Sequence, residues 1–265
     1  MYQFEYARPG SLAEATGAAA KSEEAKYLAG GQTLLPTLKQ RLAQPSALID
    51  LSNVADLRGI HAQGNGLGIG AMTTHAEVAS SNDVKATIPA LAQLAAGIGD
   101  PQVRHRGTIG GSLANNDPAA DYPAAVLALG ATVVTDKRQI PADEYFAGLF
   151  STVLEPGELI TAVGFPKPQK AGYAKFEQRA SRYPLVGVFV AQTASGVRVA
   201  VTGSGNDGVF RVPEMEAALA SNFSPDAVKD IKIDPEMMLS DLHGSAEYRA
   251  ALVSVMAARA VAAAA

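Results

Sequence analysis

Strand-like and helix-like runs of apolar residues alternate over the first 51 positions of the chain. Ser11 stands three residues before Glu14, a spacing typical of a capped helix start, and this helix should end near residue 22. After Thr33, leucines recur at helical spacing up to Leu42 and predict a second helix. This β-α-β-α-β order is typical of a small α/β layer. We expect its short strands at residues 2–6, 26–29 and 47–51.

A second α/β region is predicted between about residues 56 and 168. Asn65-Gly66 stands between two short apolar runs, which is a strong hairpin signal. A one-sided apolar pattern predicts a helix from residue 88 to 98. The Gly- and Asn-rich stretch from 100 to 123 is expected to be a long functional loop. The remaining elements are expected to be a helix at 124–129 and strands at 132–135 and 159–165.

Proline and glycine residues between positions 166 and 172 mark the best domain boundary in the sequence. Beyond it, apolar runs predict three consecutive strands, and the chain from Pro213 onward is typical of helices. The strands are expected at residues 173–178, 186–193 and 197–202. Strands followed by helices indicate an α+β unit. We therefore predict two domains, residues 1–168 with subdomains of about 1–55 and 56–168, and residues 172–265.

Composition narrows the classes of function that this chain can have. Hydrophobic residues make up 48% and charged residues 18%, which is typical of a globular protein rather than a disordered one. The net charge of −4 leaves no excess of cations for a phosphate backbone, so nucleic acid is not expected as a partner. The opening residues lack the features of a signal peptide, and no apolar run approaches the ~18 residues of a membrane span. We expect a cytoplasmic protein without a transmembrane segment.

The chain contains no cysteine, which excludes disulfides, thiolate nucleophiles and cysteine-ligated clusters from it. Its four histidines are scattered without metal-ligand spacing, so we expect no metal site. We also find no acid–base or nucleophile motif and assign no catalytic residue. Any redox chemistry must therefore come from a bound organic cofactor.

Two glycine-containing loops are the strongest candidates for binding such a cofactor. Ala29-Gly-Gly-Gln-Thr33 and Thr108-Ile-Gly-Gly-Ser112 each combine a pair of glycines with a hydroxyl side chain. Paired glycines let the backbone approach an anion closely, and successive N–H groups can converge on phosphate oxygens. Either loop alone could be an ordinary tight turn. Two of them in one predicted domain favour a dinucleotide site.

Two further features allow more than one interpretation. Asp121 follows the second loop closely enough to reach a ribose hydroxyl, but it also precedes a predicted helix and could be its N-cap. The segment Gly203–Gly208 matches the G-x-G-x-x-G pattern of Rossmann proteins. Because residues 209–213 stand where that motif requires a helix, we interpret the segment as a turn.

At these loops the chain resembles the FAD-binding medium subunit of the molybdenum hydroxylases, the family of carbon monoxide dehydrogenase and xanthine dehydrogenase. The similarity extends over nearly the whole chain. The implied fold is an FAD-binding domain of the vanillyl-alcohol-oxidase type, made of two α/β subdomains, followed by a small α+β domain of the carbon monoxide dehydrogenase flavoprotein type with a three-stranded antiparallel sheet and helices. The motifs that carry the resemblance are Phe4–Glu14, Ala29–Thr33, Ile69–Thr73, Gln102–Gly111 and Asp117–Asp121.

The resemblance also implies a set of cofactor contacts. The two glycine loops would wrap the diphosphate of FAD, and Asp121 would hold a polar group of its nucleotide portion. Ile98 would lie along the cofactor and Ile160 would border the flavin. In the second domain the family pattern Tyr-x-Lys is present as Tyr173 and Lys175.

An aromatic residue beyond that lysine, Tyr183, aligns with a tyrosine that covers the isoalloxazine ring in the family. The full set of implied cofactor-binding residues is Leu28, Ala29, Gly30, Gly31, Gln32, Thr33, Leu34, Leu35, Ile98, Thr108, Ile109, Gly110, Gly111, Ser112, Asp121, Ile160, Lys175 and Tyr183.

The implied function is that of an oxidoreductase subunit of carbon monoxide, xanthine or aldehyde dehydrogenase type. It would pass electrons from 2Fe-2S clusters of a small partner subunit through FAD to an external acceptor, while a large subunit carries the molybdopterin-type molybdenum cofactor. The assembly would be a dimer of heterotrimers. Two alternatives stay open, a stand-alone flavin oxidoreductase with its own small substrate and a flavin-free assembly protein.

Overall fold

The first layer of the computed structural model, which describes residues 1–264, is a small parallel sheet in the order β1-β3-β2. It confirms the predicted alternation of strands and helices. The first strand was predicted three residues too early, because the short central strand offers pairing partners only to residues 5–7. The elements of this layer are β1 (Glu5–Ala7), α1 (Leu12–Ala19), β2 (Ala25–Leu28), α2 (Leu34–Lys39) and β3 (Ala47–Asp50).

The predicted cap of α1 is present in a modified form. The Ser11 hydroxyl accepts a hydrogen bond from the Glu14 N–H at 3.2 Å. The Glu14 carboxylate, however, accepts from the N–H of Gly10 at 2.8 Å rather than from that of Ser11. The two side chains thus each accept a hydrogen bond from an N–H group at or just before the start of the helix, as expected from their spacing.

The second layer is a five-stranded antiparallel sheet in the order β4-β5-β10-β6-β7. The predicted hairpin joins β4 to β5, but its two turn residues are Gly64 and Asn65, because Gly66 already pairs with Gln63 as the first residue of β5; Gly64 takes the positive φ of +58° that this turn needs. β10 lies at the centre of the sheet, and its first residues lie beside the last residues of β5. The strands are β4 (Ile60–Gln63), β5 (Gly66–Gly70), β6 (Thr132–Thr135), β7 (Gln139–Pro141) and β10 (Ile160–Phe165), with a separate pair β8 (Phe146–Gly148) and β9 (Ser151–Thr152).

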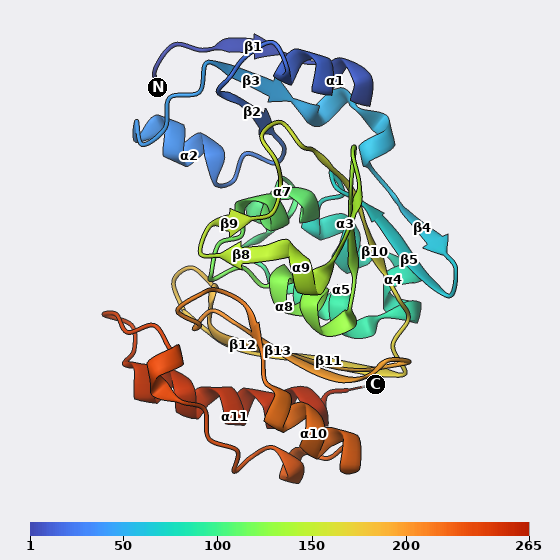
Figure 1. The fold of residues 1–265 in the computed structure, drawn as a ribbon, viewed down its shortest axis with the longest axis vertical. Coiled ribbons are helices and arrows are strands. Elements are labelled where there is room, and N and C mark those ends of the chain that lie inside the picture. The colour runs from blue at the N-terminus through green and yellow to red at the C-terminus, as the bar shows by residue number, and fades with distance from the viewer. Residues whose placement is uncertain (265) are drawn as a thin grey trace.

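Seven short helices pack in this middle region of Figure 1. The expectation of an irregular loop from 100 to 123 is wrong, because α6 and α7 form within it. Asp100 caps α6 and Thr108 caps α7, so the glycine pair of the second loop falls in the first turn of a helix. The helices are α3 (His75–Ser80), α4 (Asn82–Thr87), α5 (Pro89–Ala96), α6 (Pro101–Arg104), α7 (Ile109–Asn115), α8 (Tyr122–Leu129) and α9 (Ala142–Tyr145).

The third layer is an antiparallel sheet in the order β11-β12-β13-β14. The three predicted strands are adjacent in it, and the two-residue β14 extends it by one. The segment Gly203–Gly208 forms the turn between β13 and β14, with positive φ at both of its end glycines. The elements are β11 (Lys170–Glu177), β12 (Pro184–Thr193), β13 (Gly196–Thr202), β14 (Phe210–Arg211), α10 (Pro213–Ser221) and α11 (Ala246–Ala262).

Both faces of this third sheet are covered (Figure 1). One face packs against α11 and the other against α8, and every residue of α8 is buried. The core of the middle region accordingly includes side chains of the third sheet, among them Phe189 and Ala200. Among residues 1–264, no helix is both long and apolar enough to cross a bilayer. Single turns of 3-10 helix occur at Leu51–Asn53, Ala55–Leu57, Pro225–Ala227 and Pro235–Met237.

The contact between β11 and α11 depends on one glycine. A Cβ atom at Gly172 would lie 1.9 Å from the carbonyl oxygen of Ala260, which is backbone and cannot rotate away. In contrast, a Cβ at Gly17 in the exposed face of α1 would have nothing within 4 Å.

We therefore expect opposite effects from two glycine-to-alanine substitutions. Gly172→Ala should lower the free energy of unfolding by about 2 kcal/mol or more, because α11 must move off the sheet. Gly17→Ala should raise it by about 0.5–1 kcal/mol through helix propensity. Urea unfolding followed by circular dichroism measures both, and equal stability of the two variants would contradict the close packing of α11.

Candidate functional site

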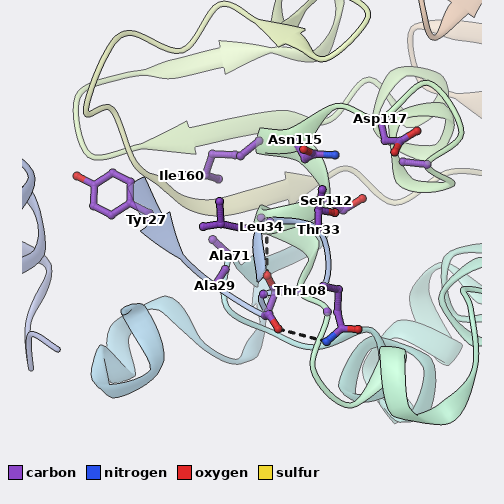
Figure 2. Close-up of a pocket in the computed structure, with 18 of the residues that line it drawn as sticks. Tyr27, Ala29, Thr33, Leu34, Ala71, Thr108, Ser112, Asn115, Asp117 and Ile160 are labelled. Carbon is purple, nitrogen blue, oxygen red and sulfur yellow. Dashed lines mark hydrogen bonds between the residues drawn. The ribbon is translucent and has the colours of Figure 1, made fainter. Parts of the chain in front are cut away.

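A cavity of about 480 Å³ lies where the first and second layers meet. Its size is within the range of small-molecule and cofactor sites. Three stretches that are distant in the sequence contribute to it: the loop after β2, the helix α7 and the start of β10. Figure 2 shows this convergence for Tyr27, Ala29, Thr33, Leu34, Ala71, Thr108, Ser112, Asn115, Asp117 and Ile160.

The two glycine loops singled out in the sequence lie against each other. A Cβ atom at Gly30 would be 2.0 Å from the carbonyl oxygen of Arg106 and 2.8 Å from the Cα of Gly107. A Cβ at Gly111 would be 3.4 Å from the Cβ of Ala29. Only residues without side chains allow the two backbones to approach this closely. The glycines therefore set the shape of the cavity wall.

The first loop carries a row of free backbone donors. Gly31 has a positive φ of +72°, and α2 begins at Leu34. Within residues 1–264, the N–H groups of residues 31–34 donate to no protein acceptor. Successive free N–H groups around a left-handed residue form a concave site for an anion. The loop can thus supply several hydrogen bonds to phosphate oxygens.

The second loop differs from the sequence-based expectation. The N–H groups of residues 109–112 donate hydrogen bonds within the protein. Their acceptors are the carbonyls of Thr73, Ala71 and Thr108 and the Thr108 hydroxyl. The bonds to Thr73 and Ala71 fasten the start of α7 to the end of β5. The second loop is thus left with hydroxyl groups, not backbone N–H groups, to offer to a ligand.

The two glycines of the second loop serve different purposes. A Cβ at Gly110 would lie 2.6 Å from the Cβ and 2.8 Å from the carbonyl oxygen of Ala71, so this glycine permits helix packing. A Cβ at Gly111 would first meet the Thr108 hydroxyl at 2.9 Å. Gly110 is thus a requirement of the fold, whereas Gly111 keeps the space between the two loops open.

Asp121 belongs to a buried polar cluster at the cavity. Its Oδ1 accepts hydrogen bonds from the Tyr173 hydroxyl at 2.7 Å and from the Lys175 ammonium at 3.0 Å. Burial raises the pKa of the Asp121 carboxyl, while the Lys175 charge and the two hydrogen bonds lower it. Burial likewise raises the pKa of Tyr173 well above its ordinary value, which keeps the hydroxyl a donor. Asp121 stands at the N-cap position of α8, but within residues 1–264 its side chain makes no capping bond.

Glu158 is a second carboxylate in the cavity wall. Arg138 binds it through Nε and Nη2, both at 2.9 Å, and the Thr135 hydroxyl donates to it at 2.8 Å. The hydrogen bonds from Arg138 are the main reason that the pKa of Glu158 falls to about 2. Its charge is therefore compensated within the protein, and it can line an anion site without strongly repelling the ligand.

Most of the residues implied by the resemblance line this cavity. The side chains of Leu28 and Leu35 lie behind the first loop, where a Cβ atom at Gly31 would contact them. Ile109 is fully buried in the core. Lys175 lies outside the lining but contacts Asp121. The implied residues in the lining are Ala29, Gly30, Gly31, Gln32, Thr33, Leu34, Ile98, Thr108, Gly110, Gly111, Ser112, Asp121, Ile160 and Tyr183.

The structure adds residues that the sequence interpretation missed. Asn115 follows Ser112 by three residues, so the two share a face of α7, and a prediction of this helix would have identified it. Phe150 comes from the turn between β8 and β9 and adopts a positive φ of +52°, for which the sequence gives no signal. Other lining residues that were not predicted from the sequence are Lys26, Tyr27, Thr37, Leu51, Ala71, Met72, His75, Val103, Gly107, Ala114, Asp117, Ala120, Leu154, Glu158 and Leu159.

His75 is a buried histidine in the cavity wall and is only 5% exposed. Its ring centroid lies 5.3 Å from that of Tyr122. Burial, helped by the positive charge of Arg104, lowers the pKa of His75 to about 4. The side chain is therefore neutral at physiological pH. No group of three or more metal-ligating side chains occurs among the described residues.

The lowered pKa of His75 predicts a loss of stability in acid. The unfolded chain binds a proton near pH 6.5, whereas the folded chain keeps His75 neutral down to about pH 4. Between pH 7 and pH 5 the free energy of unfolding should thus fall by about 2 kcal/mol through this group. His75→Gln should remove that part of the pH dependence, and the exposed His61→Gln should not. Identical pH profiles of the two variants in urea unfolding would contradict the burial of His75.

Comparison with known proteins identifies the family of the chain. Residues 2–168 match the model of the FAD binding domain in molybdopterin dehydrogenase. The nicotine 6-hydroxylase medium subunit of Paenarthrobacter nicotinovorans is 39% identical, over 97% of this chain and 95% of that protein. The carbon monoxide dehydrogenase medium chain of Afipia carboxidovorans is 36% identical, again over 97% of this chain and 95% of its own length.

Solved structures agree with the sequence comparisons. A chain of carbon monoxide dehydrogenase from Hydrogenophaga pseudoflava superimposes with a TM-score of 0.88 at 36% identity and covers 99% of this chain and 97% of its own. A chain of quinoline 2-oxidoreductase from Pseudomonas putida 86 gives a TM-score of 0.88 at 30% identity, with coverages of 98% and 96%. The chain therefore belongs to the family of FAD-binding medium subunits of carbon monoxide dehydrogenase and related molybdenum hydroxylases.

Proposed function

We propose that this chain is the electron-transfer subunit of a heterotrimeric molybdenum hydroxylase. It would receive electrons from 2Fe-2S clusters in a small partner subunit and pass them through FAD to an external acceptor. A large partner subunit would carry the molybdenum cofactor and transform the organic substrate. The observation that carries this proposal is that residues 31–34, whose N–H groups have no protein acceptor within residues 1–264, line a cavity of about 480 Å³ in an FAD-binding fold.

The residues present fit an FAD molecule in this cavity. The N–H groups of residues 31–34 and the hydroxyls of Thr108 and Ser112 would hold the diphosphate. Asp121 would accept from the nucleotide portion, as its carboxylate is fixed in place by the Tyr173 and Lys175 bonds. Leu28, Leu35 and Ile109 would support these loops from behind.

The flavin end of the cofactor would lie among apolar side chains. Ile98, Ile160, Leu34 and Tyr183 line the cavity and would exclude water from one part of it. FAD would supply the electron chemistry when bound, and the protein would supply its position and surroundings. In keeping with this division of roles, we assign no catalytic residue to the chain.

The names of the relatives favour a subunit over a stand-alone enzyme. Relatives that match most of this chain are named as medium chains or subunits for nicotine, carbon monoxide and glyceraldehyde as substrates. One type of medium chain thus accompanies several chemistries, as expected if substrate choice lies in another subunit. A stand-alone flavin oxidoreductase would instead act on a donor of its own.

Purification tests this choice directly. Expressed with the genes adjacent to its own, the chain should co-purify with a large and a small subunit as a dimer of heterotrimers in the cytoplasmic fraction, with about one FAD per copy. Metal analysis of the complex should find molybdenum and iron. A yellow chain that oxidises a small donor without partners would support the stand-alone alternative, and a colourless chain would overturn the proposal.

A charge at Ser112 tests the anion site itself. Ser112→Glu should weaken FAD binding by about 100-fold, because a carboxylate between the two loops repels the diphosphate. Ser112→Gln adds similar bulk without charge and is the matched control. Isothermal titration with FAD on the chain stripped of cofactor measures both affinities. If Glu and Gln weaken binding equally, the two loops do not hold the diphosphate.

A further inference from the structure

The ammonium group of Lys175 connects three parts of the chain. It donates to the carbonyl of Gly97 at 2.8 Å, to Oδ1 of Asp121 at 3.0 Å and to the carbonyl of Arg182 at 2.8 Å. A lysine has three N–H donors, so these bonds use its whole capacity. With its side chain only 10% exposed, Lys175 can act on a ligand only through the groups that it holds.

Each of the three oxygens is on, or directly before, a residue that lines the cavity. Gly97 directly precedes Ile98, which lines the cavity. Asp121 lines it itself, and Arg182 directly precedes Tyr183, which also lines it. Lys175 is therefore bonded next to three lining positions, which come from the segment after α5, from the start of α8 and from the loop between β11 and β12.

The loop that carries Tyr183 needs such a support. Arg182 adopts a positive φ of +62°, which costs about 1 kcal/mol or more for a residue with a side chain. Within the loop, the Arg182 N–H donates to the Gln178 carbonyl at 2.7 Å, and the Gln178 N–H donates to the Tyr183 carbonyl at 2.8 Å. The bond from Lys175 to the Arg182 carbonyl ties this end of the loop to Asp121 and Gly97, which the same ammonium group binds.

Stability alone does not account for this arrangement. A buried ion pair often contributes little net stability, because the cost of removing both charges from water offsets their attraction. A lysine that joins a carboxylate to two carbonyls of separate segments does fix the relative positions of those segments. The geometry thus fits a role in positioning.

We propose that Lys175 is a positioning residue that holds the Tyr183 loop at the mouth of the cavity and in register with Asp121, without contacting the cofactor. This inference deepens the proposed function and rests on it for the identity of the ligand. The position of the loop is a property of the chain itself and can be measured with and without FAD.

The chain contains no tryptophan, so Tyr183→Trp creates a single fluorescent reporter in the loop. Quenching of its emission by acrylamide measures how far the loop is open to solvent. Because the side chain at this position is 50% exposed, Lys175→Met in this background should raise the quenching constant by up to about twofold, as the freed loop samples open conformations. Lys167→Met, which replaces an exposed lysine between β10 and β11, should leave it unchanged.

Two further variants keep the test independent of folding. Lys175→Met combined with Asp121→Asn removes both charges of the buried pair, so no uncompensated carboxylate is left. This double variant should show the same rise in the quenching constant as Lys175→Met. Arg182→Gly keeps the carbonyl and removes the backbone strain, so the quenching constant should stay at the value of the parent reporter. Circular dichroism checks that each variant is folded.

The outcomes separate this inference from the proposed function. FAD binding with an exposed reporter in Lys175→Met supports the positioning role. An unchanged quenching constant in Lys175→Met and in the double variant overturns it while FAD binding, and with it the proposed function, stands. Loss of FAD with an unchanged reporter would make Lys175 a direct ligand and also overturn it. If the chain with its native Tyr183 fails to bind FAD, the proposed function fails, and the quenching of the ligand-free reporter chain still decides the role of Lys175.

Discussion

The contact between two backbones at Gly30 is the constraint on which the site depends. The carbonyl of Arg106 occupies the place that any side chain at this position would need. This contact brings the first layer against the start of α7 and so creates a wall with free N–H groups on one side and hydroxyls on the other. Cavity shape and ligand chemistry thus arise from the same pair of loops.

Much of the fold could be predicted from the sequence because its turns and strands carry local signals. The hairpin at Gly64–Gly66 and the three long strands after residue 168 follow directly from turn chemistry and apolar runs. The helix α7 was missed because its two glycines are poor helix formers. They are tolerated in the first turn, where Thr108 caps the helix and tertiary bonds fix the backbone.

The candidate site was predictable only in part, for a related reason. Glycine pairs and a hydroxyl reveal in the sequence which loops can approach an anion. They do not reveal which N–H groups remain free, since residues 109–112 use theirs on β5 and on Thr108. The three bonds of Lys175 join residues 97, 121 and 182, and such long-range partners leave no trace in spacing.

The complete burial of α8 affects how the protein is synthesised. This helix packs against α5, α7 and α9 and against the third sheet, whose strands β12 and β13 emerge from the ribosome more than fifty residues later. Until then its apolar surface stays in contact with water or a chaperone. A nascent chain cut at the proline-rich segment after residue 165 would carry both glycine loops of the site and yet expose the surface of α8 that β12 and β13 cover.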